Sequence, residues 1–340
     1  MRLSKSTFFR RAVECVVVVV VACVAAAARA LAAAPAPNYV AYTGCCDGSA
    51  AAPVNEALFA NASDEENVLR LYPRGTGGAP VATLNLRGFL GPHGQAEADL
   101  EGAARLGDTL YWIGSHSRNA DGQLRPARHV VFATTIRGTG AAARLEASGQ
   151  PYRNLAVAVA AEPSFERYRF AAGMKVAAEA PGGFNIEGLA AGPSESLYVG
   201  LRNPLYQGRA LVVPLLNPRA VTQEGQPARL GPVLELDLQG LGIRDLARAG
   251  DRWLVLGGPA EKGGRHRLFL WEGGEHRPVP LPAAVVPKGF QAESLVVDDV
   301  AGGHVAELLA DEDDVKIGGV DCWKIKDPTK RRFRGLRVAY

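Results

Sequence analysis

Residues 187–201 read Glu-Gly-Leu-Ala-Ala-Gly-Pro-Ser-Glu-Ser-Leu-Tyr-Val-Gly-Leu. An acidic residue opens a short apolar segment, the turn signal Gly192-Pro193-Ser194 follows, and a second apolar segment begins at Leu197. Glycine and proline between short apolar runs are typical of tight turns that join antiparallel strands. This stretch therefore predicts a strand, a turn and a second strand, with the acid at the head of the first strand.

The same pattern occurs five times along the chain. Each copy starts at an acid and reaches a second apolar run after a turn; the opening acids are Asp47, Glu101, Glu187, Asp245 and Glu293. A third apolar segment follows in each copy, the last of them at 319–325, and a fourth often precedes the next acid. Four antiparallel strands repeated at roughly 50 residues are typical of β-propeller blades. The sequence therefore predicts an all-β fold, a five- or six-bladed β-propeller.

One interval breaks this rhythm. The distance from Glu101 to Glu187 is much longer than the others, and it contains the alanine-rich segment 152–162. Such a segment favours a helix. We expect a helical insertion after the second blade, at about 150–180; a degenerate sixth blade is the alternative.

The direction of the strands places the opening acids on one face. In a four-stranded antiparallel blade, the start of the first strand and the end of the second lie at the same end. The five acids therefore share a face with the polar loops that follow each second strand, at 63–67, 115–119, 202–203, 259–262 and 311–314. The first strand of each blade lines the central channel, so we expect the acids to converge near its mouth.

The N-terminus carries the features of a secretory signal. Basic residues including Arg10 and Arg11 precede an apolar run at 16–28, and Ala30-Leu31-Ala32 supplies a cleavage site of small residues. The run is shorter than the about 20 residues that a spanning helix needs. We therefore predict a signal peptide at 1–32, no membrane span, a single propeller domain at 33–340 and a periplasmic or secreted location. Cys23 at the end of a lipobox-like segment leaves a lipoprotein as the alternative, and the export route stays open.

Charge argues against a nucleic-acid partner. The chain has 38 basic and 35 acidic residues, and residues 1–32 hold five of the basic and one of the acidic ones, which leaves 33 and 34. A nearly neutral mature chain has no electrostatic footprint for nucleic acid. The basic residues between Lys324 and Arg337 are interpreted as a solvated tail. We expect a monomer.

Three cysteines remain after the predicted signal, at Cys45, Cys46 and Cys322. Disulfides persist outside the cytosol, so one of the adjacent pair is expected to bridge to Cys322. Such a bridge would tie the first repeat to the last. Which of Cys45 and Cys46 takes part stays open, and the other is left as a thiol.

Several phrases resemble a known bacterial family. They are 46–50, 63–72, 185–189, 202–205 and 332–336. Over about 40–336 the chain resembles an exported family catalogued only as a domain of unknown function and related to phytase-like or esterase-like β-propellers. The resemblance implies a propeller fold but no reaction. The family usually has Asp-Glu-Asp-Asn in the first polar loop, and Glu66 replaces the second Asp here, which weakens a metal site in that loop.

Carboxylates that face one channel mouth repel each other unless they bind protons, hydrogen-bond donors or a cation. Acids recur at the motif position without histidine, which favours a hard cation, Ca²⁺ or Mg²⁺, over zinc. The candidate metal ligands are the five opening acids. The alternative is that each acid accepts backbone N–H bonds from the neighbouring blade and fixes the spacing between blades.

Residues near the same mouth suggest a reaction. Glu187, Glu101 and His116 are the candidate catalytic residues, with His116 as a possible general base. Arg118, Arg202 and Asn203 are the candidate substrate-binding residues, because arginine binds phosphate or carboxylate with two hydrogen bonds. One hypothesis is a metal-dependent hydrolase of phosphoesters or esters, phytase-like or lactonase-like. The other is a non-enzymatic propeller that binds a ligand or a protein, since propellers host many functions.

Overall fold

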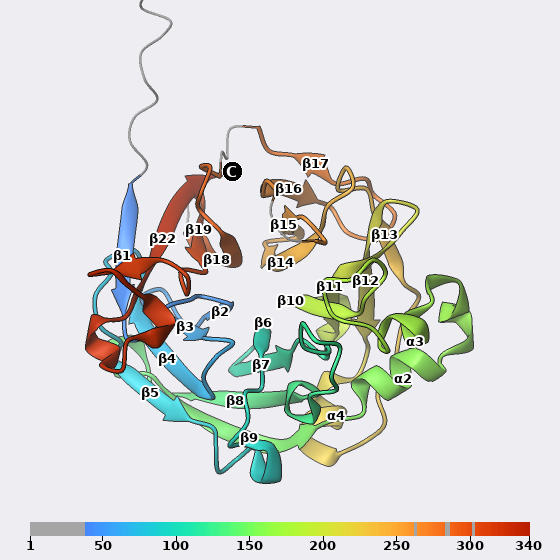
Figure 1. Ribbon diagram of the computed structural model, residues 1–340, viewed down its shortest axis with the longest axis horizontal. Helices are drawn as coiled ribbons and strands as arrows, with labels where there is room; N and C mark the ends of the chain where they lie inside the picture. The colour runs from blue at the N-terminus through green and yellow to red at the C-terminus, as the bar shows by residue number, and fades with distance from the viewer. Residues whose placement is uncertain (1–37, 262–263, 283–285, 301–302) are drawn as a thin grey trace, which may run out of the picture. The chain divides into compact units, whose positions relative to one another are not determined.

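Five four-stranded antiparallel sheets stand around a common axis (Figure 1). The computed structural model describes residues 38–340 except 262–263, 283–285 and 301–302. Residues Tyr39–Tyr340 form one compact unit. The predicted signal peptide and Cys23 lie outside the described residues. Among the described residues, no helix is long and apolar enough to cross a membrane.

The first and second blades follow each other directly in the chain. The first consists of β2 (Ala50–Pro53), β3 (Leu58–Ala62), β4 (Val68–Pro73) and β5 (Ala82–Asn85). The second consists of β6 (Leu100–Leu106), β7 (Thr109–Gly114), β8 (Val131–Arg137) and β9 (Arg144–Tyr152). Each blade is thus a simple antiparallel meander.

The third and fourth blades repeat this order. The third consists of β10 (Asn185–Ala191), β11 (Leu197–Tyr206), β12 (Arg209–Leu215) and β13 (Leu234–Leu236), with α4 (Pro218–Glu224) before β13. The fourth consists of β14 (Gly242–Ala249), β15 (Arg252–Gly258), β16 (Arg267–Trp271) and β17 (Val279–Pro280).

The fifth blade joins the two ends of the described chain. It contains β18 (Ala292–Val300), β19 (Gly303–Ala310) and β22 (Arg332–Ala339), and β1 (Tyr39–Thr43) pairs with β22 as its outer strand. The prediction of its third strand at 319–325 is wrong. That segment belongs to an excursion between β19 and β22, which holds the small hairpin β20 (Lys316–Ile317) and β21 (Val320–Asp321).

The interval after the second blade is helical, as expected. It contains α2 (Leu155–Ala161) and α3 (Phe170–Gly173), whose apolar side chains pack in the core between the second and third blades. The sheets of the described residues account for five blades, so the alternative of a sixth is wrong.

Aromatic side chains fill the spaces between blades. Tyr198 of the third blade packs against Trp253 and Trp271 of the fourth, with ring centroids 5.2 to 5.4 Å apart. Tyr42 of β1 packs in the same way against Phe59 in the first blade, at 5.2 Å. Burial of such large apolar surfaces is the main force that holds neighbouring blades together.

The inner strands approach each other too closely for side chains at some positions. A Cβ atom on Gly102 would lie 2.9 Å from the Cβ of Leu189 in the next blade, and one on Gly188 would lie 2.4 Å from Leu246. The glycine after the opening acid is therefore required by the contact between adjacent blades.

A β-bulge at the head of an inner strand sets the direction of the side chain that comes just before this close contact between blades. The strand register shifts at Glu101, Glu187, Arg244 and Glu293, so each of these is the extra residue of a bulge at the head of an inner strand. Bulges commonly redirect a side chain next to a functional site. The acidic end of the channel is built at these positions.

Candidate functional site

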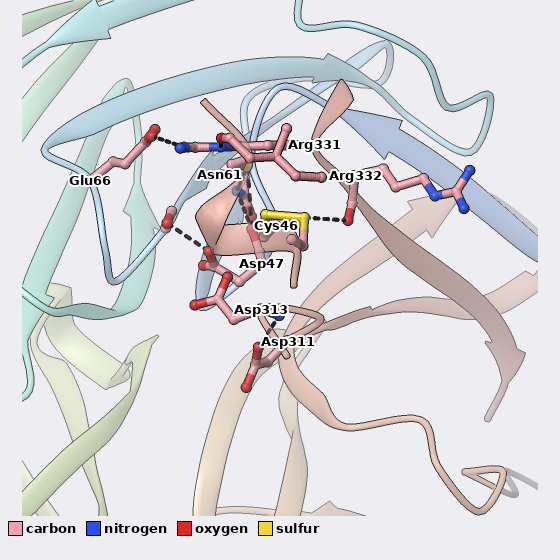
Figure 2. Close-up of a disulfide and its surroundings, with 12 residues drawn as sticks. Cys46, Asp47, Asn61, Glu66, Asp311, Asp313, Arg331 and Arg332 are labelled. Atoms are coloured by element: carbon pink, nitrogen blue, oxygen red, sulfur yellow. Dashed lines mark hydrogen bonds and ion pairs between the residues drawn. A yellow bond between two sulfur atoms is a disulfide. The ribbon is translucent and has the colours of Figure 1, made fainter. Parts of the chain in front are cut away.

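Three aspartates meet at the head of the first blade. Oxygen atoms of Asp47, Asp64 and Asp313 all lie within 4.8 Å of one another. Figure 2 shows Asp313 directed at Asp47 from the chain segment that follows β19. Asp47 is almost fully buried, and it accepts hydrogen bonds from Ser63 Oγ at 2.6 Å and Ser49 Oγ at 2.9 Å.

A second group adjoins the first and shares one of its members. Oxygen atoms of Asp64, Asp99 and Glu101 also lie within 4.8 Å of one another. Asp99 pairs with Arg128 at 2.9 Å. Among the described residues, Glu101 makes no hydrogen bond or ion pair. We call Asp47, Asp64, Asp99, Glu101 and Asp313 the acidic cluster.

The acidic cluster lacks the donors that its charge would need. Asp64 Oδ1 and Asp313 Oδ1 are buried and have no hydrogen-bond partner in the described part of the chain. Burial raises the pKa of Asp47 to about 6, of Asp99 to about 7 and of Asp313 to about 8. Burial and the neighbouring carboxylates raise the pKa values of Asp64 and Glu101 well above their usual range. Without a counter-ion, the cluster therefore retains protons at neutral pH.

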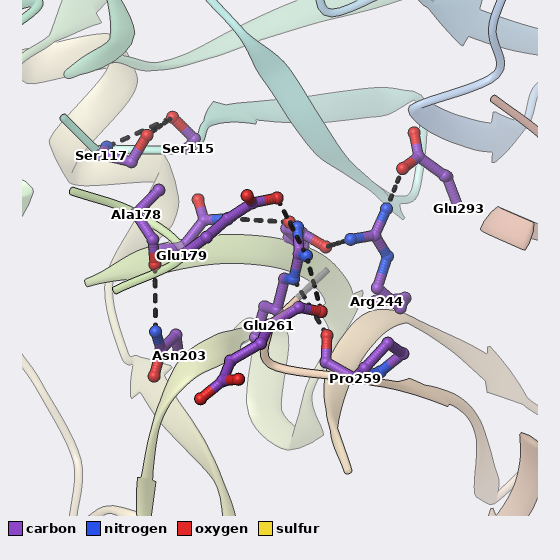
Figure 3. A network of polar contacts seen from close by, with 12 residues as sticks. Ser115, Ser117, Ala178, Glu179, Asn203, Arg244, Pro259, Glu261 and Glu293 are labelled. Atoms are coloured by element: carbon purple, nitrogen blue, oxygen red, sulfur yellow. Dashed lines mark hydrogen bonds and ion pairs between the residues drawn. The ribbon is translucent and has the colours of Figure 1, made fainter. Parts of the chain in front are cut away.

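The other side of the channel mouth is neutralised by arginine. Glu187 accepts from Arg202 at 2.9 Å, from Arg244 at 2.8 Å and from Asn185 at 2.7 Å. Arg244 also pairs with Glu293, as Figure 3 shows, and Glu293 accepts from Ser49 Oγ at 3.2 Å. We call Glu187, Arg202, Arg244 and Glu293 the arginine–glutamate network. Ser49 connects it to Asp47.

The expected ring of five equivalent acids therefore needs correction. Asp47 and Glu101 lie in the acidic cluster, whereas Glu187 and Glu293 pair with Arg244, which takes the bulge position of the fourth blade. Asp245 is one residue further along and points between blades. Its carboxylate accepts the N–H of Leu246 and, across the blade boundary, the N–H of Leu295, both at 2.8 Å.

The donors of the predicted substrate-binding residues are occupied by the protein itself. Arg118 donates to the carbonyl oxygens of Met174 at 2.7 Å and Gly122 at 2.9 Å. Asn203 donates to those of Ala178 and Ala180. Arg202 also donates to the carbonyl oxygen of Pro259. These contacts fix the loops around the mouth.

His116 is buried and does not lie on the surface. Its Nδ1 is 2.8 Å from the carbonyl oxygen of Gly114, and its ring packs against His129 with centroids 5.4 Å apart. Burial lowers the pKa of His116 to about 3, so the ring is neutral at physiological pH. Its backbone φ of +54° lies in the left-handed region, which is uncommon outside glycine, although histidine is enriched there together with asparagine and aspartate.

Three members of the acidic cluster were not among the candidates from sequence. Asp64 and Asp313 lie in two of the polar loops that the strand pattern placed at this end, and Asp99 comes two residues before Glu101. The repeated acid at one motif position could not indicate these three aspartates, because each of them occurs in one blade only and is not repeated in the others. The polar loops were the signal that was available.

A disulfide holds the loop that carries Asp313. Cys46 is bonded to Cys322, and Cys45 is a buried free thiol, which resolves the open choice of pairing. We call residues 311–331 the closing loop. Within this loop, Trp323 N donates to the carbonyl oxygen of Asp313 at 3.3 Å. The loop is also joined to the first repeat, because Glu312 N donates to the carbonyl oxygen of Cys46 at 3.0 Å. A pocket of about 120 Å³, lined in part by Asp47, Asp313 and the exposed Trp323, opens beside the cluster.

Comparison with known proteins confirms the resemblance predicted from the sequence. Residues 127–294, just under half of the chain, match the model of a family described as a protein of unknown function (DUF3616). No curated protein matches the sequence.

Several solved structures are similar to the chain. Glutaminyl cyclase from Myxococcus xanthus aligns with a TM-score of 0.46 and 11% identity, over 89% of this chain and 95% of that one. The GH43_1 enzyme from Xanthomonas citri aligns with a TM-score of 0.43 and 12% identity, over 87% and 89%. The PQQ-bound aldose sugar dehydrogenase from Streptomyces coelicolor aligns with a TM-score of 0.42 and 13% identity, over 90% and 99%. At these scores we draw nothing about activity from them.

Proposed function

We propose that this chain is an exported β-propeller that binds a divalent cation, Ca²⁺ or Mg²⁺, in the acidic cluster. The observation that carries the proposal is the pair of buried, unpartnered oxygens on Asp64 and Asp313, close to three further carboxylates. Burial of ionised carboxylates without donors is costly, and a cation removes that cost.

The donor set fits a hard cation. The described cluster offers carboxylate oxygens and neighbouring serine hydroxyls, with no histidine or free thiol among its members. Ca²⁺ takes six to eight such ligands, and Mg²⁺ takes fewer carboxylates and keeps more water. Asp64 belongs to both groups of three, so it is the residue on which binding depends most.

The same site supports an anionic or ester substrate. A bound divalent cation polarises a phosphoryl or carbonyl oxygen. Once a bound cation has displaced the proton that burial favours on Glu101, this carboxylate, which has no partner among the described residues, is the member best suited to accept a proton from the nucleophile. Glu187 fixes Arg202 and Arg244 at the opposite side of the mouth, and because this network is neutralised internally, the bound cation supplies the positive charge for an anionic substrate. We propose hydrolysis of a phosphoester or ester on this basis.

Calorimetric titration of the chelator-treated mature protein with CaCl₂ and MgCl₂ tests the first step. We expect saturable binding to the native protein and a loss of affinity of at least tenfold in Asp64→Asn, because that variant removes a ligand charge from both groups. Asp251→Asn is the matched control, since this aspartate is fully exposed at the other end of an inner strand. Equal affinity in Asp64→Asn and native protein would contradict the site.

A panel of phosphoesters, lactones and carboxyl esters tests the second step. Hydrolysis should require the cation and should fall in Glu101→Gln more than cation affinity does. A specific observation favours a second candidate, a non-enzymatic propeller that binds a ligand or a protein: the donors of Arg118 and Asn203 are already occupied. Cation binding without turnover on any member of the panel would favour it.

A further inference from the structure

The channel opens into a large cavity at the end opposite the acidic cluster. The cavity has a volume of about 1150 Å³, and the later halves of the inner strands of all five blades line it. Its walls are mostly alanine, leucine and valine, such as Ala104, Leu189 and Val297. A cavity of this size lies slightly above the range of typical small-molecule sites, so it has ample room for a small organic ligand.

Two arginines stand at the rim in equivalent positions. Arg105 is four residues after the bulge of the second blade, and Arg248 is four residues after that of the fourth. Arg105 donates Nε to the carbonyl oxygen of Gly107 and Nη1 to that of Val54, both at 2.7 Å. Arg248 donates in the same way to Gly250 at 2.9 Å and to Gly192 of the neighbouring blade at 3.3 Å.

These contacts immobilise the guanidinium groups without neutralising them. Among the described residues Arg105 has no carboxylate partner, and Arg248 reaches only the fully exposed Asp251 at 4.0 Å. An exposed ion pair of that length contributes little. Neither arginine has a hydrogen bond from its Nη2 to another described residue.

The residues that line the cavity carry a net charge of +1. Its lining holds three arginines and two carboxylates, Glu56 and Asp298. Asp298 is already paired with Arg74. A fixed positive rim around an apolar cavity is complementary to an anion that has an apolar body.

We infer that this cavity is a second binding site, for an aliphatic monocarboxylate. The hydrocarbon chain lies in the apolar part of the channel, and the carboxylate accepts hydrogen bonds from the Nη groups of Arg105 and Arg248 at the rim. The inference is independent of the proposed cation site.

Calorimetric titration with decanoate, with neutral 1-decanol in parallel, tests this inference. We expect one decanoate per chain, and weaker binding by about tenfold or more in Arg105→Gln and in Arg248→Gln, because each loses a charge-assisted hydrogen bond. Decanol should bind the native protein about as weakly as decanoate binds the double variant. Ala191→Leu, which adds three carbon atoms to the cavity wall, should also weaken decanoate binding.

Arg137→Gln is the matched control, because Arg137 is an exposed arginine on the outside of the second blade. It should bind decanoate like the native protein. Absence of decanoate binding, or equal binding by the native protein and the double arginine variant, would overturn the inference. Ca²⁺ titration of the same samples separates this failure from failure of the cation site, and urea denaturation shows that each variant is folded.

Discussion

At the scale of single residues, Asp245 has a structural role. Its two carboxylate oxygens accept N–H groups from its own strand and from β18 of the next blade, and it is 2% exposed. Asp245→Ala leaves two buried N–H groups without an acceptor, so we expect a loss of about 2–4 kcal/mol in the free energy of unfolding. Urea denaturation measures it, with the exposed Asp251→Ala as control. A loss under about 0.5 kcal/mol would contradict this role.

The same residue shows why the site was only partly predictable from sequence. The acid at the head of each repeat indicated the end of the channel at which the acidic cluster lies, and two of these acids, Asp47 and Glu101, belong to that cluster. In the fourth blade, however, the order is Arg244-Asp245, and Arg244 takes the bulge position that an acid holds in the second, third and fifth blades. Side chains of adjacent residues point to opposite faces of a strand, so the arginine and not the acid faces the channel mouth.

At the scale of elements, the closing loop connects the disulfide to the acidic cluster. Cys46 and Cys322 are 276 residues apart, so loss of the bond in Cys46→Ala/Cys322→Ala should cost about 5 kcal/mol of unfolding free energy in the loop-entropy model. Because Asp313 belongs to the same loop, we also expect at least fivefold weaker Ca²⁺ binding. Cys45→Ala, which keeps the disulfide, is the control. Unchanged Ca²⁺ affinity in the double variant would show that Asp313 is held without the bond.

The elements themselves were largely predictable, and the exceptions have a common cause. Alternating short apolar runs and turns indicated the blades, and the alanine-rich segment 152–162 in an over-long interval indicated the helical insertion. The third strand of the fifth blade was misplaced because a cysteine-containing loop interrupts that blade, and local pattern cannot tell a loop with two short strands from a blade strand. Pairing of β1 with β22 joins segments almost 300 residues apart, and local sequence carries no signal of such a contact.

At the scale of the whole molecule, the channel separates charge. One end holds the acidic cluster, and the other holds the arginine rim. Raised pKa values at the acidic end mean that the folded protein keeps protons that the unfolded chain has released. Stability must then fall as pH rises towards the folded pKa values, such as the pKa of about 8 for Asp313. Below about pH 6.5 the opposite effect enters, because burial lowers the pKa of His116 to about 3 and of His266 to about 4.

The window from about pH 6.5 to about pH 8 therefore isolates the carboxylates. In chelator we expect the free energy of unfolding to fall across it by about 2 kcal/mol for each group that stays protonated in the folded state. Saturating Ca²⁺ should abolish the decline, because a bound cation favours the ionised carboxylates, and Glu101→Gln should reduce it. Urea denaturation at four pH values measures the slope, with the exposed Glu146→Gln as control. If Ca²⁺ leaves the slope unchanged, the protons and the cation do not compete for the same carboxylates, and the cation site lies elsewhere.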